Sequence, residues 1–197
     1  MAFLFEDARD DAGAVDEVGV VEDSEDGLTA ALVSDAGTPC IADPGFMLIR
    51  AAVEAGIEPV IIPGVSALTF AISASALPSD HFTFHGFVPV KSGRRRAELE
   101  RIAADKRTAV VFESPFRIAK LLSEVAEVIG PDTPLALVRE ATKIHEQILR
   151  GPASLLAEQA KKVNWKGEIV LVIDARDDAD RASDDTISIS DDDSSEN

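Results

Sequence analysis

The sequence predicts an α/β fold in its first half and an α+β fold in its second half. Two short apolar runs, residues 31–33 and 59–62, each lead into a turn rich in Gly and Pro, and a stretch with helical spacing of apolar residues lies between them at 46–55. Strand, turn, helix and strand in this order are typical of a parallel sheet with crossover helices. Further downstream, strand-like and helical stretches alternate less regularly, which favours α+β.

The turns that follow the two apolar runs are the first candidate ligand site. Ligands of open α/β sheets bind outside the carboxyl ends of the strands, which is where both turns fall. Glycine allows a positive φ and a close approach of the backbone to a ligand, and short polar side chains can bind the ligand or their own backbone. The plainer alternative is a pair of ordinary connecting turns. The predicted ligand contacts are Asp35, Gly37, Thr38, Pro39, Pro63, Gly64, Ser66 and Ala67.

Several motifs resemble one enzyme family. VSDAGTPCIADPG at 33–45 and IPGVSAL at 62–68 are similar to the tetrapyrrole methylase superfamily of S-adenosylmethionine (SAM) enzymes, and more narrowly to its small-subunit ribosomal RNA cytidine 2′-O-ribose methyltransferases. Further matching motifs follow in the family's order: GFVPVKSG from 86, ESPFR from 113, REATKIHE from 139 and KGEIVLVI from 166.

The resemblance implies a tetrapyrrole methylase-like fold, in which SAM lies between a parallel α/β domain and a second domain with a mainly antiparallel sheet. It also implies a ribosomal RNA substrate, a homodimer and a cytoplasmic location. The family's Gly-rich first strand and turn have no counterpart in this sequence, so the SAM-binding domain is expected to be partial and methyl transfer impaired. Two alternatives stay open: a catalytically silent RNA-binding or dimerisation module, and a methyltransferase that acts on a tetrapyrrole.

The charge of the chain is concentrated at its two ends. Of the net charge of −17, residues 1–28 contribute −9 and residues 176–197 contribute −7. Such acidic segments of low hydrophobicity bury too little apolar surface to fold, so both are predicted to be disordered, with at most one short strand at 18–21. The predicted domains between them are 29–80, for the partial SAM domain, and 81–175, whose net charge of +3 is compatible with RNA.

The second domain is predicted element by element from apolar periodicity and from Gly and Pro boundaries. Pro115 suits the first turn of a helix, and Gly130 with Pro131 ends that helix. In the first domain, Ser66 is a plausible cap for a helix at 66–76. The predicted strands of the second domain cover 82–87, 109–112, 134–139, 146–150 and 168–173, and its helices cover 94–104, 115–129 and 152–162.

A basic cluster follows the first of these strands. Cations at the start of a helix oppose the helix dipole, so we expect the cluster to bind RNA phosphates, although a solvated helix start is the alternative. The cluster consists of Lys91, Arg94, Arg95 and Arg96. In the strand before it, alternating phenylalanines (Phe82, Phe84 and Phe87) are interpreted as a buried face rather than as a platform for RNA bases.

Two further segments concentrate ionisable residues. A ribose hydroxyl has a high pKa, so methyl transfer benefits from a base or from a group that orients the oxygen. The candidates for this role are Glu113, Glu140 and His145, and Arg117, Arg139 and Lys143 are candidates for RNA binding. Internal salt bridges are the alternative for all six. The spacing matches no metal site, no Ser-His-Asp triad and no phosphate-binding glycine loop.

Overall fold

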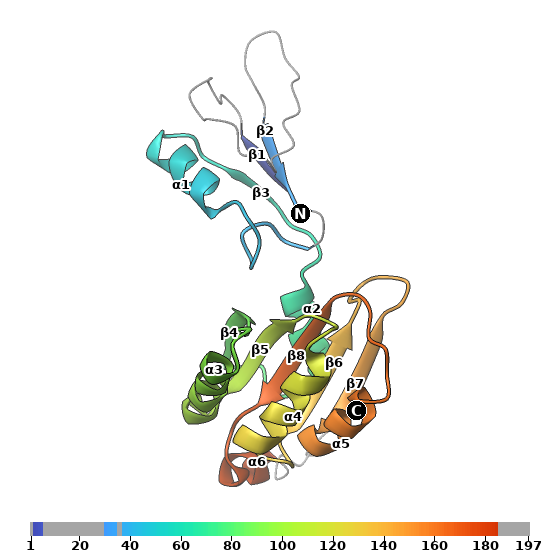
Figure 1. Cartoon of the computed structure of the whole chain (residues 1–197). Helices are drawn as coiled ribbons and strands as arrows, with labels where there is room; N and C mark the ends of the chain where they lie inside the picture. Colours follow the sequence, from blue (N-terminus) through green and yellow to red (C-terminus); the bar gives the residue numbers. More distant parts are fainter. Residues whose placement is uncertain (1, 6–29, 35–36, 185–197) are drawn as a thin grey trace, which may run out of the picture.

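The computed structural model describes residues 2–5, 30–34 and 37–184, which form two sheets (Figure 1). The smaller sheet has the strand order β2-β1-β3 and consists of β1 (Ala2–Phe5), β2 (Ala30–Val33) and β3 (Val60–Ile62). The larger sheet has the order β4-β5-β8-β6-β7 and consists of β4 (Phe82–Phe87), β5 (Thr108–Glu113), β6 (Pro134–Arg139), β7 (Gln147–Pro152) and β8 (Ile169–Asp174).

The smaller sheet differs from the predicted parallel arrangement in one respect. Strands β2 and β3 run in the same direction, but β1 lies between them and is antiparallel to both. The prediction of disorder in 1–28 is therefore wrong for Ala2–Phe5, because this short apolar run satisfies its backbone groups by pairing with two neighbours. The suggested strand at 18–21 lies outside the described residues.

The smaller sheet has little core of its own. Among the residues whose burial the structure describes, Leu32 and Ala52 form its buried hydrophobic cluster, the latter from helix α1 (Phe46–Glu54), and a few partly buried side chains pack against them. Ala31 of β2 is also buried. The three residues of β3 are each about half exposed, at 44–50%. Helix α1 also exposes apolar side chains, namely Phe46, Met47 and Val53. Sheets of so few strands need further packing to be stable, so this part of the chain depends on contacts beyond its own core.

The larger sheet confirms the mainly antiparallel second domain. Only β4 and β5 are parallel neighbours, and the β5–β8, β8–β6 and β6–β7 pairs are antiparallel. All five predicted strands are present, with ends within two residues of the predicted ones.

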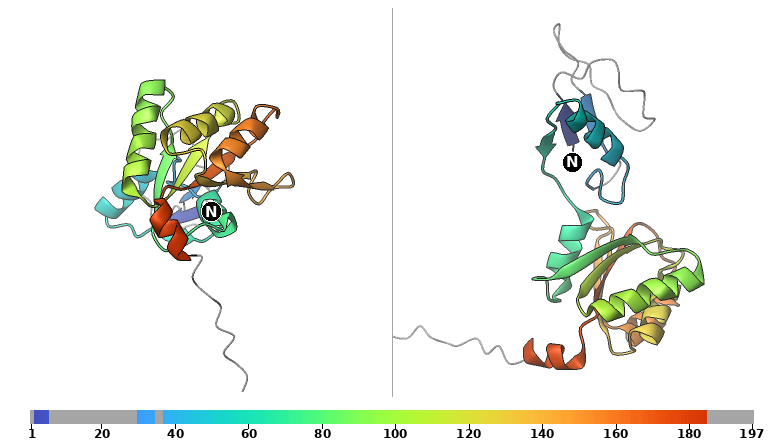
Figure 2. Two further views of the ribbon diagram at one scale, coloured as in Figure 1. Left: turned by 90° about the horizontal axis from the view of Figure 1, so that it is seen from below. Right: turned by 90° about the vertical axis from the view of Figure 1, so that its left-hand side faces the viewer.

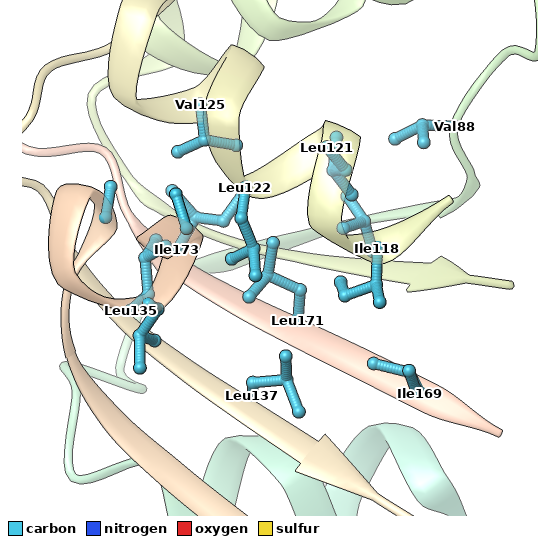
Figure 3. Close-up of a cluster of buried hydrophobic side chains, with 14 of the residues drawn as sticks. Val88, Ile118, Leu121, Leu122, Val125, Leu135, Leu137, Ile169, Leu171 and Ile173 are labelled. Atoms are coloured by element: carbon cyan, nitrogen blue, oxygen red, sulfur yellow. The ribbon is translucent and has the colours of Figure 1, made fainter. Parts of the chain in front are cut away.

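Helices cover both faces of the larger sheet (Figure 2). On one face pack α3 (Ser92–Asp105), α4 (Ile118–Val128) and α5 (Ala153–Ala160), and their apolar side chains form the main core with β5, β6 and β8 (Figure 3). The other face carries α2 (Ala67–Ser75), whose Ala71 and Ile72 are buried against the sheet. Although α2 falls within the predicted first domain, it packs on the sheet of the second.

A short helix, α6 (Asp178–Asp184), follows the last strand. The prediction of disorder for 176–197 is therefore wrong for this helix, because the chain is tied back to the sheet. Arg181 Nη1 donates to the carbonyl oxygen of Asp174 at 3.1 Å, and Lys106 Nζ binds Asp177 at 2.8 Å. The hydrogen bond from Lys106 lowers the pKa of Asp177 to about 2. Residues 185–197 lie outside the described part of the chain.

The structure also corrects the assignment of Arg95 to RNA binding. Its side chain is only 4% exposed, and its guanidinium donates to both carboxylate oxygens of Glu124 and, at 2.8 Å, to the carbonyl oxygen of Val90. Arg95 precedes the buried Leu99 and Ile102 by four and seven positions, so it lies on the inward stripe of α3. The hydrogen bond between the two side chains raises the pKa of Arg95 and lowers the pKa of Glu124.

We predict that Glu124→Gln lowers the free energy of unfolding by about 1–3 kcal/mol at pH 7, because it leaves a buried guanidinium without its counter-charge. Since the folded-state pKa of Glu124 is lowered, its contribution is present above the unfolded-state pKa and is lost as the pH falls through the folded-state value. Urea unfolding at pH 7 and pH 3 should therefore show a deficit that shrinks at the lower pH.

Glu127→Gln is the matched control on the same helix. Glu127 pairs with Arg96 at 2.8 Å, but both side chains are more than half exposed, so its loss should change stability by less than about 0.5 kcal/mol. Equal losses in the two variants would contradict the structural role given to the Arg95–Glu124 pair.

No helix in the described part of the chain is long and apolar enough to cross a membrane.

Candidate functional site

A cleft of about 530 Å³ lies where one edge of the larger sheet faces the turns of the first half. This edge gathers the carboxyl ends of β4, β5 and β6 with the amino end of β8. The strand register shows why, since Ile169 of β8 is the partner of both Glu113 and Arg139. The segments that follow or precede these strands therefore meet at one place, although they are far apart in the sequence.

Residues of the two Gly- and Pro-containing turns form the opposite wall of the cleft. The Thr38 hydroxyl donates to the carbonyl oxygen of Val65 at 3.3 Å and so joins the first turn to the second. Of the predicted ligand contacts, Gly37, Thr38, Ser66 and Ala67 line the cleft.

Three further predicted contacts, Pro39, Pro63 and Gly64, do not line the cleft. Pro39 is buried beneath its turn, whereas Pro63 and Gly64 are exposed outside the cleft. Asp35 lies outside the described residues. Sequence reasoning missed Ala42, which lines the cleft and has no polar group that could have marked it.

The aromatic floor of the cleft comes from β4 and β5. Phe87 and Phe112 line it, and their rings make an edge-to-face contact with centroids 5.7 Å apart. Phe84 contacts Phe112 in the same way at 4.9 Å. The interpretation of the strand as a buried face is therefore correct for Phe84, which packs in the core beside α2. It is wrong for Phe82 and Phe87 at the two ends of the strand, which are 37% and 56% exposed.

Glu113 contacts two residues of the turn that follows β5. Its side chain is buried, and Oε1 accepts a hydrogen bond from the Ser114 amide at 2.6 Å. The same oxygen forms an ion pair with Arg117 Nη2 at 2.5 Å. Because side chains alternate along a strand, Glu113 shares the face of Val111, which packs against the α3–α5 layer, whereas Phe112 lies on the opposite face. Glu113 thus lies on the other face of β5 from Phe112, and it is nonetheless one of the residues that line the cleft.

Glu140 holds the loop after β6 to the turn before β8. Its amide donates to the carbonyl oxygen of Glu168 at 2.9 Å, and its Oε1 accepts from the Glu168 amide at 2.8 Å. The carboxylate covers Gly167, where any Cβ would collide with it and where φ is +84°. The backbone hydrogen bond lowers the pKa of Glu140, which makes its carboxylate a weaker base.

The third candidate base, His145, is not brought to the cleft. Its side chain is exposed, and it lies outside the set of residues that line the cavity. The loop from Glu140 turns through two residues with positive φ, Glu140 and Thr142, and no simple spacing in the sequence reveals which of its side chains face inward.

Among the predicted RNA-binding residues, Lys143 lines the cleft, where its Nζ binds Glu168 at 3.0 Å. Arg139 donates from Nε to the carbonyl oxygen of Lys166 at 2.6 Å. Lys91 and Arg94 are exposed beyond the end of β4, and Arg96 is exposed but paired with Glu100 and Glu127.

Comparison with curated proteins identifies relatives of known name. The chain is 46% identical over 158 residues to ribosomal RNA small subunit methyltransferase I of Xylella fastidiosa, covering 79% of this chain and 58% of that protein. It is 45% identical over 147 residues to the protein of the same name in Mycobacterium tuberculosis, covering 75% and 51%. The chain thus spans little more than half the length of these relatives.

A solved structure shows the same fold, and a family model shows the family. A conserved hypothetical protein from Aeropyrum pernix K1 has a similar fold, with a TM-score of 0.52 at 23% identity over 72% of this chain and 56% of that one. The model of the family "Tetrapyrrole (Corrin/Porphyrin) Methylases" matches residues 4–157. Because this match covers most of the sequence, the chain belongs to the tetrapyrrole (corrin/porphyrin) methylase family.

Proposed function

We propose that the chain binds SAM in the cleft and takes part in methylation of the ribose 2′-oxygen of a cytidine in small-subunit ribosomal RNA. The observation that carries this proposal is the cleft itself, which has the two turns on one wall and the loops at the strand ends of the larger sheet, with Lys143, on the other. The names of the relatives, at 45–46% identity, support ribosomal RNA as the substrate, and a ribosomal RNA substrate favours the cytoplasm as the location.

The residues of the cleft fit SAM. Its volume of about 530 Å³ is within the usual range for small-molecule sites. Gly37, Ala67 and Gly167 leave room along the walls, the aromatic floor suits an adenine ring, and the hydroxyls of Thr38 and Ser66 can bind polar groups of the cofactor. When bound, SAM supplies an electrophilic methyl group on a sulfonium.

The chain's own contribution is orientation. Placing two reactants in line can lower a barrier by about 7–11 kcal/mol, and this requires walls that do not move. We assign Glu113 and Glu140 to this task, since each is engaged in hydrogen bonds that hold a cleft-forming segment in place. A direct role for His145 stays a prediction.

A second candidate function is a binding or dimerisation module without catalysis. The observation in its favour is the exposed apolar surface of β3 and α1, which would be covered in a homodimer. We propose such a dimer for this chain in either case. Failure to bind SAM, with RNA binding intact, would select the module.

Filling the cleft should abolish cofactor binding. Ala67→Leu adds a bulky side chain at a lining position, so we expect the affinity for SAM, measured by isothermal titration calorimetry, to fall by roughly tenfold or more. Ala51→Leu makes the same change at an exposed position of α1 and should leave the affinity unchanged. If both variants keep their circular dichroism spectra and bind SAM alike, the cleft is not the cofactor site.

The proposed dimer predicts an effect of charge on β3. Ile61 is 50% exposed, and Ile61→Lys would place an ammonium in the apolar contact. Light scattering should then report the mass of one chain in place of two. Val163→Lys, at a position that is 49% exposed near the end of α5, should leave the dimer intact. A monomeric parent protein would exclude this assembly.

A further inference from the structure

Three apolar side chains project along the sheet edge that borders the cleft. Phe116, in the turn after β5, is 93% exposed, and Ile144, in the loop after β6, is 94% exposed. Phe87, at the end of β4, is 56% exposed and lines the cleft between its aromatic floor and solvent. Because β4, β5 and β6 end at the same edge, the three side chains form a row that we call the apolar tips.

The turns that carry two of the tips are held in place. The Phe116 amide is bound by the Ser114 hydroxyl at 3.3 Å, and Glu113 ties the Ser114 amide to Arg117. In the other loop, the Thr142 amide donates to the Glu146 carboxylate at 2.8 Å. Exposed side chains on such preorganised turns lose little further freedom when they bind a partner.

Cations alternate with the apolar tips. Arg117 directly follows Phe116 and is paired with Glu113, and Lys143 directly precedes Ile144 and is paired with Glu168. The exposed Lys91 and Arg94 follow Phe87 within seven residues. The four segments 88–94, 113–117, 139–146 and 166–168 together contain six Lys and Arg residues and four Glu residues, so their net charge is positive. A row in which phosphate-binding cations alternate with side chains that can stack on bases is suited to an unpaired nucleic-acid strand, whereas a duplex hides its base faces.

We propose that this edge is a track for single-stranded RNA, in which Phe116 and Phe87 stack on unstacked bases, Ile144 packs against a third, and the cations contact the phosphates. The inference rests on the proposed function and adds to it that the substrate is read as an unpaired segment rather than as a helix. Stacking tolerates any base, so the apolar tips supply affinity and register for the strand that enters the cleft.

The test uses the full chain and a fluorescently labelled uridine dodecamer, with an RNA duplex of the same length as the comparison. We expect fluorescence anisotropy to show tighter binding of the single strand. Phe116→Ala should weaken that binding roughly tenfold, and Phe116→Trp should retain it, since a base stacks well on either aromatic ring. Phe82→Ala is the matched control: Phe82 is on β4 but at its other end, away from the cleft.

Salt dependence separates stacking from charge. Phe116→Ala removes no phosphate contact, so the slope of log K against log salt should stay the same. Lys91→Ala should reduce that slope by about 0.7. Because Phe116 is almost fully exposed, thermal unfolding of its variants should match that of the parent.

Three results would overturn the proposal: unchanged single-strand affinity in Phe116→Ala, duplex binding as tight as single-strand binding, or a loss of self-association in Phe116→Ala without a loss of RNA affinity. The last result would assign the apolar tips to a second copy of the chain. Calorimetry with SAM distinguishes the two proposals. If the parent chain does not bind SAM but Phe116→Ala still weakens binding of single-stranded RNA, the proposed catalysis is refuted and the RNA track is supported.

Discussion

The central strand β8 is the constraint on which the site depends. All six of its residues are buried, and its antiparallel pairing with both β5 and β6 brings its amino end to the carboxyl ends of those strands. Three loops that are distant in the sequence consequently share one edge. Shifting β8 by one residue would exchange its two buried faces and would also misplace the edge, so core packing and site geometry are specified by the same register.

The carboxylates near this edge of the sheet hold the surrounding turns in place. Glu113 and Glu140 accept backbone and side-chain hydrogen bonds that fix the turns beside them, and Glu168 pairs with Lys143 across the cleft wall. Hydrogen bonds to ionised groups are stronger than those between neutral groups, so a few carboxylates suffice to hold irregular backbone. The cleft thus gains rigid walls from residues whose acidity suggests catalysis when the sequence is considered alone.

The two halves of the molecule differ in how completely they are packed. The larger sheet is covered by helices on both faces, one of them α2 from the first half, while the smaller sheet leaves β3 and part of α1 exposed. Arg150 strengthens the link, because its guanidinium binds the carbonyl oxygens at the end of α2. The first half is therefore attached firmly at α2, and its exposed apolar side chains remain available for assembly.

The sequence alone determined the family, the five strands and three helices of the second half, and the turns at Gly37–Thr38 and Ser66–Ala67, because short-range periodicity and turn chemistry are local properties. It did not determine the pairing of β1, the burial of Arg95 or the inward-facing residues of the loop after β6. Each of these is decided by a partner distant in sequence: two neighbouring strands for β1, Glu124 for Arg95, and the turn at Gly167 for Glu140. Only the folded chain brings such partners together. Tertiary contacts therefore decide whether a charged side chain is paired within the protein or exposed and able to bind a ligand.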